Sequence, residues 1–558
     1  MKPISILFVQ LSGVTYSEME GQLLDKEESF DTAYNKEGKS LPLGVLYLSA
    51  CLEEKFKTNV NQSIVDYVEE LDELDSYRSV DDFIEGIAVK GVSSDPDIIA
   101  ISLMFTTSYK FFKQLVKIYR TLWPNATFIV GGVYATVVAE YILQKNEIDY
   151  VFRGESEVAL MEFMDSFMGD GGQSIQGVYS KKDIGTGFCD ICQLPDLNEL
   201  PYPNWGLINF PVYVKANKTL KRYGDDEVKI TEMMGSRGCP YKCTFCAGSV
   251  SMNHRKFRKR SVENILGEAT ELYKRYGVTS FIFMDDMQFI NEKRFLEFEE
   301  AFKSMDIQNF DFQNQGFHCN TTTLKMIDSV SETVSSILFA LDSASQYVQN
   351  EIILKKIKLE RAKELVSYSR SKGLITRVNV IFGFPNETKE MMREGADYMR
   401  TLQADWFIIL TAIPFVGSEL FNQFAEMGAV NHNDEDLWEN SAYCERFFDT
   451  DTCTADELKN FTYKLNLDLN FINNYNLKVG NYARAISLFE ERLQAYPNHT
   501  FGLIALHKAY EGLGDVDQCN NIKSRLYRTI SESESARQMH EVHRDLLVGT
   551  EFYDLPAM

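Results

Sequence analysis

The sequence predicts an α/β protein with an N-terminal doubly wound domain, a partial (βα)6 barrel and a C-terminal helical domain. Three observations lead to this prediction. Short β-branched runs alternate with helical stretches over roughly the first 170 residues. The alternation stops in an irregular, proline-bearing segment and restarts near Lys229. From about Asn431 the apolar residues recur only at helical spacing. We therefore predict domains over 1–170, 229–430 and 431–558, with a linker over 171–228.

The first domain contains five predicted strands, each a short apolar run bounded by turn residues. In chain order they are ISILFV, QSIVD, DIIAISL, TFIVGG and IDYVFRG. Helical segments such as YKFFKQLVKIYRTLW and TVVAEYILQK separate them. This order is typical of a doubly wound parallel sheet, whose ligand site lies at the carboxyl ends of the strands. The segments SLMFTT, GGVYAT and GESE stand at those ends.

The second domain repeats the strand–helix unit six times. Its predicted strands are KITEMMG, SFIFMDD, FDFQNQG, SILFALD, RVNVIFG and WFIILTA. One helix is well marked, because Ser261 can cap its start and Gly277 can end it. In a barrel of this kind, functional residues lie on the loops that follow the strands. A loop with three cysteines directly follows the first strand, so we expect it on the functional face.

The C-terminal domain has the spacing of a helical repeat. Gly480 and Gly514 are 34 residues apart, and Ala485, Phe489 and Pro497 stand where a tetratricopeptide repeat places its small, aromatic and proline residues. One and a half such repeats cannot bury a core alone. We therefore expect these helices to pack on the barrel, either as a structural cap or as a surface that binds a partner.

Composition narrows the class of protein. The formal net charge is −24 and the pI is near 4.9, the opposite of the basic footprint that nucleic-acid binding needs. The longest apolar runs are far shorter than the roughly 20 residues of a membrane span, and the N-terminus lacks a signal peptide. We therefore expect a cytoplasmic protein. There, ten cysteines favour metal or redox chemistry over disulfides. The isolated pair Cys189 and Cys192 is assigned no role.

The sequence Cys239-Pro-Tyr-Lys-Cys243-Thr-Phe-Cys246 carries the main chemical signal. Structural zinc and most iron–sulfur clusters take four protein ligands, whereas three thiolates leave one iron open. The segment resembles the CxxxCxΦC loop of radical S-adenosylmethionine enzymes, with Phe245 as the aromatic residue. The resemblance implies that Cys239, Cys243 and Cys246 hold a 4Fe–4S cluster. Its open iron would chelate S-adenosylmethionine, whose one-electron cleavage gives the 5′-deoxyadenosyl radical. A three-cysteine zinc site is the alternative.

Other parts of the barrel resemble this family, and the resemblance implies further S-adenosylmethionine contacts. In FMDDMQF, carboxylates would face the cofactor's ammonium, although paired aspartates at a strand end also cap helices. FALDSAS resembles the fourth-strand motif, and RVNVIFGFPNET the fifth. IPFVGSEL resembles the sixth-strand segment but lacks its Pro-Gly-Thr, so we assign it no adenine contact. The candidate cofactor-binding residues are Asp285, Asp286, Asp342, Ser343, Arg377 and Asn379.

The N-terminal domain is similar, in order, to the Rossmann-type domain of cobalamin-binding radical S-adenosylmethionine enzymes. The resemblance implies cobalamin contacts from Ser102, Thr106, Gly131, Gly132, Tyr134, Gly154 and Glu155. No DxHxxG motif occurs and all seven histidines lie at or after His254, so we expect no histidine ligand on cobalt. Tyr134 stands where the family often has histidine. It would either fill the lower face of the corrin or mark a domain that no longer binds it.

Together these resemblances imply a cobalamin-dependent radical enzyme that methylates an unactivated carbon or phosphorus centre of a small molecule or peptide. Flavodoxin or ferredoxin would re-reduce the cluster, with the basic segment 253–261 as the expected contact for its acidic surface. Two alternatives remain open from sequence. One is a radical rearrangement, ring contraction, cyclisation or dehydrogenation without methyl transfer. The other is a non-catalytic iron–sulfur scaffold or sensor that recruits a partner through its helical tail.

Overall fold

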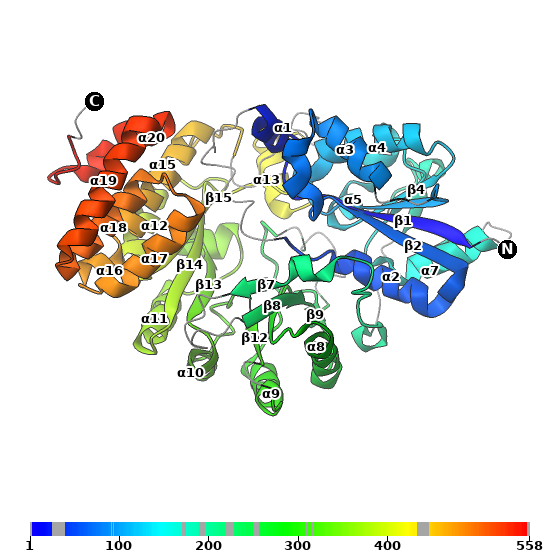
Figure 1. Ribbon diagram of the computed structural model, residues 1–558, viewed down its shortest axis with the longest axis horizontal. Coiled ribbons are helices and arrows are strands. Elements are labelled where there is room, and N and C mark those ends of the chain that lie inside the picture. Colours follow the sequence, from blue (N-terminus) through cyan, green and yellow to red (C-terminus); the bar gives the residue numbers. More distant parts are fainter. Residues whose placement is uncertain are drawn as a thin grey trace. The chain divides into compact units, whose positions relative to one another are not determined.

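The chain, seen in a computed structural model, forms two compact units (Figure 1). The structure describes residues 3–24, 39–90, 92, 94–169, 174–188, 196–217, 228–246, 248, 256–307, 310–314, 316–431 and 446–554. Among these, the first unit holds the residues up to 314 together with 413–431. The second unit holds 316–412 and 446–554. Each unit has its own sheets and its own apolar core, and the predicted domain boundaries stay predictions.

The first unit begins with a six-stranded sheet in the order β2-β1-β3-β4-β5-β6. The first five strands are parallel, as predicted, and β6 joins antiparallel. Helices α2 and α7 cover one face, and α3 and α4 cover the other (Figure 1). The strands are β1 (Ile4–Gln10), β2 (Val60–Asp66), β3 (Ile98–Ser102), β4 (Thr127–Gly131), β5 (Tyr150–Phe152) and β6 (Val178–Ser180). The helices are α1 (Tyr16–Leu24), α2 (Leu43–Phe56), α3 (Val80–Lys90), α4 (Tyr109–Leu122), α5 (Val133–Val137), α6 (Ala139–Lys145) and α7 (Ser156–Met168).

A second sheet of the first unit carries the first three predicted barrel strands. Its order is β12-β11-β8-β7, with β7 antiparallel and the others parallel. Helix α8 starts and ends as predicted: Ser261 accepts a hydrogen bond from Asn264 N, and Gly277 adopts a left-handed φ of 71°. The elements are β7 (Lys215–Asn217), β8 (Val228–Met233), β9 (Ser236–Arg237), β10 (Arg258–Lys259), α8 (Val262–Tyr276), β11 (Ser280–Phe283), α9 (Glu292–Lys303), β12 (Asp311–Asn314) and α13 (Glu419–Glu426).

The second unit carries the other three barrel strands as a parallel sheet in the order β13-β14-β15. Alternate residues of β14 are buried and half-buried, so Arg377 and Asn379 share its less buried face. The elements are α10 (Leu324–Thr333), β13 (Ser336–Asp342), α11 (Leu359–Ser371), β14 (Ile375–Phe382), α12 (Lys389–Leu402) and β15 (Trp406–Thr411).

The C-terminal helices pack on this sheet, as predicted. One apolar core joins Trp406 of β15 to helical residues such as Phe471, Phe489 and Phe501. The helices are α15 (Ala455–Leu467), α16 (Tyr475–Lys478), α17 (Tyr482–Ala495), α18 (Thr500–Leu513), α19 (Val516–Glu532) and α20 (Glu534–His543). Helices α17, α18 and α19 form a consecutive stack (Figure 1). Their assignment to the tetratricopeptide family stays a prediction.

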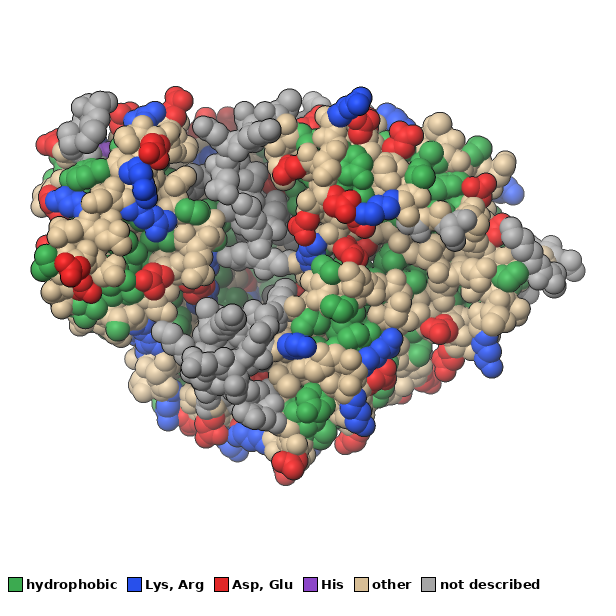
Figure 2. Space-filling model, viewed as in Figure 1, with side chains coloured by type: hydrophobic (Ala, Val, Ile, Leu, Met, Phe, Trp, Pro, Cys, Tyr) green, Lys and Arg blue, Asp and Glu red, His purple; other side chains and the backbone are tan. Residues whose placement is uncertain are grey.

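The linker over 171–228 stays a prediction as a domain boundary, but it contains regular structure. Its described residues contribute β6 to the first sheet and β7 to the second, so the segment is built into both. The predicted helix TVVAEYILQK is also divided, because the chain leaves helical geometry at Val138. None of the described helices is long and apolar enough to cross a bilayer. On the face shown in Figure 2, acidic and basic side chains are interspersed.

Candidate active site

The cysteine loop follows β8, where the sequence places it. Cys239, Cys243 and Cys246 are all half-buried, and none of the seven described cysteines forms a disulfide. Inside the loop, Cys246 N donates to the Cys243 carbonyl over 3.2 Å. The buried Thr244 accepts, through its carbonyl, a 2.9 Å hydrogen bond from the first turn of α13. The loop is therefore held at its centre by backbone contacts.

Three thiols on one short loop are a donor set suited to an iron–sulfur cluster. Among the described residues, however, no three His, Cys, Asp or Glu side chains are gathered closely enough to hold a metal ion. The loop thus presents the required ligands without an assembled site. The assignment of Cys239, Cys243 and Cys246 as cluster ligands stays a prediction, and so does the role of Phe245, which is half-buried beside them.

Asp285 and Asp286 occupy different environments at the end of β11. The Asp285 carboxylate accepts hydrogen bonds from Gly235 N at 2.9 and 3.1 Å and from the Ser236 hydroxyl at 3.1 Å. Burial raises the pKa of Asp285 to about 7, although these hydrogen bonds oppose the rise. Asp286 is exposed. Asp285 therefore fixes the start of the cysteine loop, whereas Asp286 is the better placed of the two to meet a cofactor.

Asp342, the last residue of β13, lies beside Asn379 in the middle of β14 in the second unit. Asn379 Nδ2 donates to Asp342 Oδ1 over 2.8 Å, and Asn379 Oδ1 accepts from Leu341 N over 2.9 Å. Both oxygens of Asp342 are used, because the buried Lys355 forms an ion pair with Oδ2. Lys355 Nζ also donates to the Ala340 carbonyl over 2.7 Å. The expected contacts from Asp342 and Asn379 are therefore made to each other and to Lys355.

Backbone strain is concentrated around this ion pair. Asp342, Leu354 and Lys356 adopt positive φ values of 65°, 53° and 57°, which are unfavourable for residues with a Cβ. Such strain persists only where surrounding contacts enforce it, and it is frequent at functional sites. Lys355, between two of the strained residues, also lowers the pKa of the buried His318, after the larger effect of burial, to about 3. Ser343 is buried and its hydroxyl accepts from Ser345 N over 3.2 Å.

Arg377 differs from the sequence expectation. Its guanidinium donates to both carboxylate oxygens of Glu491, on α17, over 2.8 and 3.0 Å. The side chain thus ties a C-terminal helix to β14. Its predicted contact with S-adenosylmethionine stays a prediction with no support from this geometry.

The GFPNET segment forms a closed turn. Glu387 accepts hydrogen bonds from Gly383 N over 2.7 Å and Phe384 N over 3.1 Å, and burial raises its pKa to about 7. Arg446 donates to the Gly383 carbonyl and, over 2.6 Å, to the Cys453 carbonyl.

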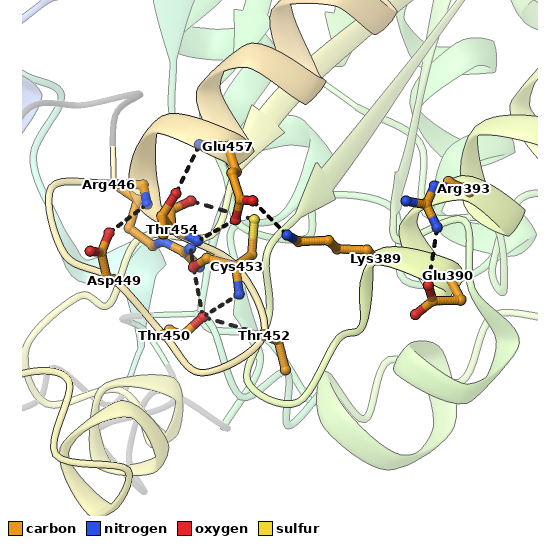
Figure 3. Close-up of polar contacts among 11 residues, drawn as sticks. Lys389, Glu390, Arg393, Arg446, Asp449, Thr450, Thr452, Cys453, Thr454 and Glu457 are labelled. Atoms are coloured by element: carbon orange, nitrogen blue, oxygen red, sulfur yellow. Dashed lines mark hydrogen bonds and ion pairs between the residues drawn. The ribbon is translucent and has the colours of Figure 1, made fainter.

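The neighbouring start of α15 is closed by a reciprocal Thr454–Glu457 capping box (Figure 3). Glu457 also pairs with Lys389 over 2.6 Å (Figure 3). These contacts join the GFPNET turn to the start of α15, so the segment has a structural role.

The predicted cobalamin residues lie at the carboxyl edge of the first sheet. Ser102 and Gly131 are paired at the ends of β3 and β4. Gly132 has a φ of 107°, and an added Cβ would lie 2.4 Å from the Leu103 carbonyl oxygen. The glycine is thus required by the protein's own backbone. Thr106 opens the short turn before α4 and is half-buried. Gly154 N donates to the Thr136 hydroxyl over 3.0 Å.

Tyr134 and Glu155 point to contacts within the protein. Tyr134 is only 3% exposed and packs edge-on against Tyr109, at 6.2 Å between ring centroids. Burial raises the pKa of its hydroxyl well above 10. Glu155 forms ion pairs with Arg237 and Arg258. Direct cobalamin contacts by Tyr134 and Glu155 stay predictions. Sequence reasoning had no signal for the ion pairs of Arg237 and Arg258 with Glu155, or for the burial of Lys355.

The same edge of the first sheet carries an exposed apolar group. Met104 and Phe105 follow β3 and are each 38% exposed, and Val133 follows β4 and is 46% exposed. Exposed apolar side chains at the ligand-binding edge of a doubly wound sheet are suited to contact an apolar ligand surface. The largely apolar face of a corrin ring suits it, so the residues present fit cobalamin.

Known protein families match both the domain of the first sheet and the region that carries the cysteine loop. Residues 34–164 match the B12 binding domain family, and residues 233–399 match the Radical SAM superfamily. An uncharacterized methyltransferase of Pyrococcus horikoshii is 25% identical over 394 residues, covering 68% of this chain and 77% of the relative. Cytidylyl-2-hydroxyethylphosphonate methyltransferase of Streptomyces wedmorensis is 25% identical over 433 residues, covering 70% and 79%.

Solved structures show the same fold. The cobalamin-dependent S-adenosylmethionine radical enzyme OxsB superposes with a TM-score of 0.62 at 14% identity, covering 98% of this chain and 84% of OxsB. The radical S-adenosylmethionine methyltransferase TsrM of Kitasatospora setae gives 0.53 at 15% identity, covering 76% and 78%. The two matched families, the cysteine loop and the apolar edge of the first sheet lead to one conclusion. The chain belongs to the cobalamin-binding radical S-adenosylmethionine enzymes, which use a 4Fe–4S cluster, S-adenosylmethionine and cobalamin.

Proposed function

We propose that this enzyme transfers a methyl group to an unactivated carbon or a phosphorus centre of a small molecule or peptide. The observation that carries the proposal is the exposed apolar group of Met104, Phe105 and Val133. It lies at the ligand edge of a doubly wound sheet, in the same compact unit as the cysteine loop. A second support is that two relatives covering 68% and 70% of this chain are named methyltransferases, one of them for a phosphonate.

The residues divide the work as follows. When bound, cobalamin supplies the methyl donor, and the cluster with S-adenosylmethionine supplies the radical that removes a hydrogen atom. The cysteines present thiolates to the cluster, and Asp285 fixes the loop that carries them. The apolar group would shield one face of the corrin from water. Asp286, exposed at the end of β11, is the proposed partner of the cofactor's ammonium group.

Reductive cleavage consumes an electron, so the proposal includes flavodoxin or ferredoxin as the donor. Sequence reasoning placed the donor at the basic segment 253–261, of which 253–255 lie outside the described residues. The structure changes this picture, because Arg258 pairs with Glu155 and the buried Arg260 pairs with Glu268. Lys256 and Lys259 are exposed. They are therefore the proposed contacts for an acidic electron donor.

The products of S-adenosylmethionine test the proposal without knowledge of the substrate. The full chain would be reconstituted anaerobically with iron, sulfide and cobalamin, desalted, and treated with S-adenosylmethionine and a reductant. With a methyltransferase, S-adenosylmethionine that loses its methyl group to cobalamin would give S-adenosylhomocysteine. S-adenosylmethionine that is cleaved reductively would give 5′-deoxyadenosine. A rearrangement or dehydrogenation gives 5′-deoxyadenosine alone, and that result would refute methyl transfer. Neither product would form on a scaffold or sensor.

Two pairs of variants locate the cofactors. C243A should abolish the cluster's visible absorption and 5′-deoxyadenosine, whereas C51A, at a half-buried cysteine outside the loop, should retain both. V133E should lose corrin absorption after desalting yet keep the cluster, because a carboxylate at this exposed edge opposes contact with an apolar ring. V158E makes the same change at a 36% exposed valine on α7 and should retain cobalamin. Equal cobalamin retention in V133E and V158E would rule out this apolar edge as the binding surface.

A further inference from the structure

The chain that carries the three cysteines leaves and re-enters the fold through a short ribbon. Strands β9 and β10 pair antiparallel, with Arg237 opposite Arg258 and Ser236 opposite Lys259. All three cysteines lie between these strands, and Cys239 is two residues beyond Arg237. Like charges directly opposite each other destabilise a strand pair. Two facing arginines at the neck of a functional loop therefore need a compensating partner.

Two carboxylates from the cobalamin-binding domain supply that partner. Arg258 donates to both oxygens of Glu155, over 2.8 and 2.5 Å, in the two-pronged geometry that makes arginine–carboxylate pairs strong. Arg237 donates to Glu157 over 2.5 Å and lies 3.5 Å from a Glu155 oxygen. Glu155 thus bridges both strands of the ribbon. The two positive charges are balanced by two negative charges.

The pairs are shielded from water. The side chains of Arg237, Arg258 and Glu155 are 16%, 13% and 20% exposed, and that of Glu157 is 7% exposed. Partly buried ion pairs with several hydrogen bonds hold their geometry better than exposed ones, which contribute little. These contacts therefore form a fixed joint.

The joint begins at a ligand-binding edge. Glu155 and Glu157 flank the first residue of α7, directly after β5 and the glycine at 154. Negative side chains are favoured at a helix N-terminus, which steadies both carboxylates. Any ligand that contacts the loop after β5 is therefore one side chain away from the neck of the cysteine loop.

We propose that Glu155 and Glu157 are positioning residues that latch the cysteine loop to the cobalamin-binding domain and balance the arginine charge beside the cluster. The latch rests on the proposed function, since it concerns the same two cofactor sites, but it does not require methyl transfer. It assigns Glu155 a role other than the direct cobalamin contact expected from sequence. It also explains how the loop after β5 and the cysteine loop keep a fixed position relative to each other within one compact unit.

The charge balance is tested by the reduction potential of the cluster. E155Q leaves one positive charge in excess near the cluster, which favours its reduced, more negative state. Redox titration of the reconstituted full chain should show a less negative midpoint potential for E155Q than for the wild type. The double variant E155Q/R258Q restores charge balance and should return toward the wild-type potential. D165N removes a carboxylate from the same helix α7, in an exposed pair with Lys55, and should leave the potential unchanged.

The geometry of the latch is tested by amide hydrogen exchange in the full chain without cofactors. E155Q and R258K should each speed exchange in residues 236–246, and D165N should not. R258K keeps the charge but loses the two-pronged contact, so its cluster potential should match the wild type. The proposal is overturned if E155Q equals D165N in both potential and exchange. If E155Q takes up no cluster, unchanged exchange in R258K overturns it instead. A chain that shows these shifts but forms no S-adenosylhomocysteine would refute methyl transfer while supporting the latch.

Discussion

Among single residues, Lys355 carries the strongest structural prediction. K355M removes one partner of a buried ion pair and leaves the Asp342 carboxylate in a buried site, which typically costs about 3–5 kcal/mol. We expect a loss of that order in the free energy of unfolding of the second unit, measured by urea denaturation. K358M, at an exposed lysine three residues away, should change stability by less than about 0.5 kcal/mol. Recovery of part of the loss in K355M/D342N would identify the unpaired charge as its cause, and no recovery would contradict it.

At Arg377 the contact expected from the family differs from the observed one. The resemblance implies a contact with S-adenosylmethionine, whereas the side chain pairs with Glu491. Its side chain and that of Glu491 are 23% and 39% exposed, and pairs of this kind contribute about 0–1 kcal/mol. R377M and E491Q should therefore cause similar, small losses of stability. Equilibrium dialysis of the reconstituted enzyme should show unchanged affinity for S-adenosylmethionine in both variants. A loss of affinity about tenfold or greater in R377M alone, equivalent to 1.4 kcal/mol, would restore the cofactor contact.

Asp285 makes stability depend on pH. Its pKa rises to about 7 in the folded protein, so between its ordinary value near 3.8 and about 7 the folded state binds more protons than the unfolded chain. Stability therefore falls as pH rises through this range and is level above it. Since one pKa unit is worth about 1.4 kcal/mol, the group should account for roughly 2 kcal/mol between pH 5.5 and 8. D285N should lose this share of the slope in urea denaturation, while D286N should keep it.

Residue types were predicted from sequence better than residue partners. Cys239, Cys243 and Cys246 were found because their spacing is local. Lys355 stands in LKKIKL among lysines that are exposed, and no local pattern distinguishes the one that is buried. The contact of Arg237 with Glu157 joins residues 80 apart in the chain. Only the tertiary fold brings such pairs together, so reasoning from motifs assigned Glu155 to a ligand.

At the scale of elements, the turn after β14 offers a matched pair of glycines. Gly383 and Gly373 both have a φ of 84°, which is unfavourable for alanine. A Cβ at Gly383 would lie 2.4 Å from Leu458 Cδ2 on α15, whereas a Cβ at Gly373 would meet nothing within 4 Å. G373A should cost about 1 kcal/mol from strain alone. G383A should cost clearly more, because it also displaces α15, and equal losses in thermal denaturation would show that the helix is not held there.

Strands and helices followed their local patterns closely. The predicted strands of both domains were confirmed because β-branched runs between turn residues encode a buried parallel strand. The strands β6 and β7 were missed because each has three residues at a sheet edge, too few for a period to show. The break at Val138 was missed for a different reason. The apolar spacing of TVVAEYILQK continues across it, while α5 on one side of the break packs beside β4 and β5.

At the scale of the whole molecule, each of the two units contains some of the predicted cofactor-binding residues. The first unit contains the cobalamin-binding domain, the cysteine loop and Asp285, and the second contains Asp342, Asn379 and Lys355. Their cores are also separate: one lies under β1, β3 and α7, and the other joins β15 to the C-terminal helices. A ligand that binds one unit should therefore slow amide hydrogen exchange in that unit, and the protected residues should show which unit it binds.

Cobalamin gives the sharpest test of this division. A ligand that binds only the folded state suppresses local opening, by about 2.7 kcal/mol at a concentration of 100 times its Kd. In hydrogen exchange of the full chain, added cobalamin should slow exchange in the loops after β3, β4 and β5. The ion pairs of Glu155 and Glu157 should extend this protection to β9 and β10, and D165N should show the same extension while E155Q does not. Helices α17, α18 and α19 should be unaffected, because their core lies in the second unit. Protection that appeared only in those helices would place cobalamin away from the first sheet and contradict both the proposed function and the latch.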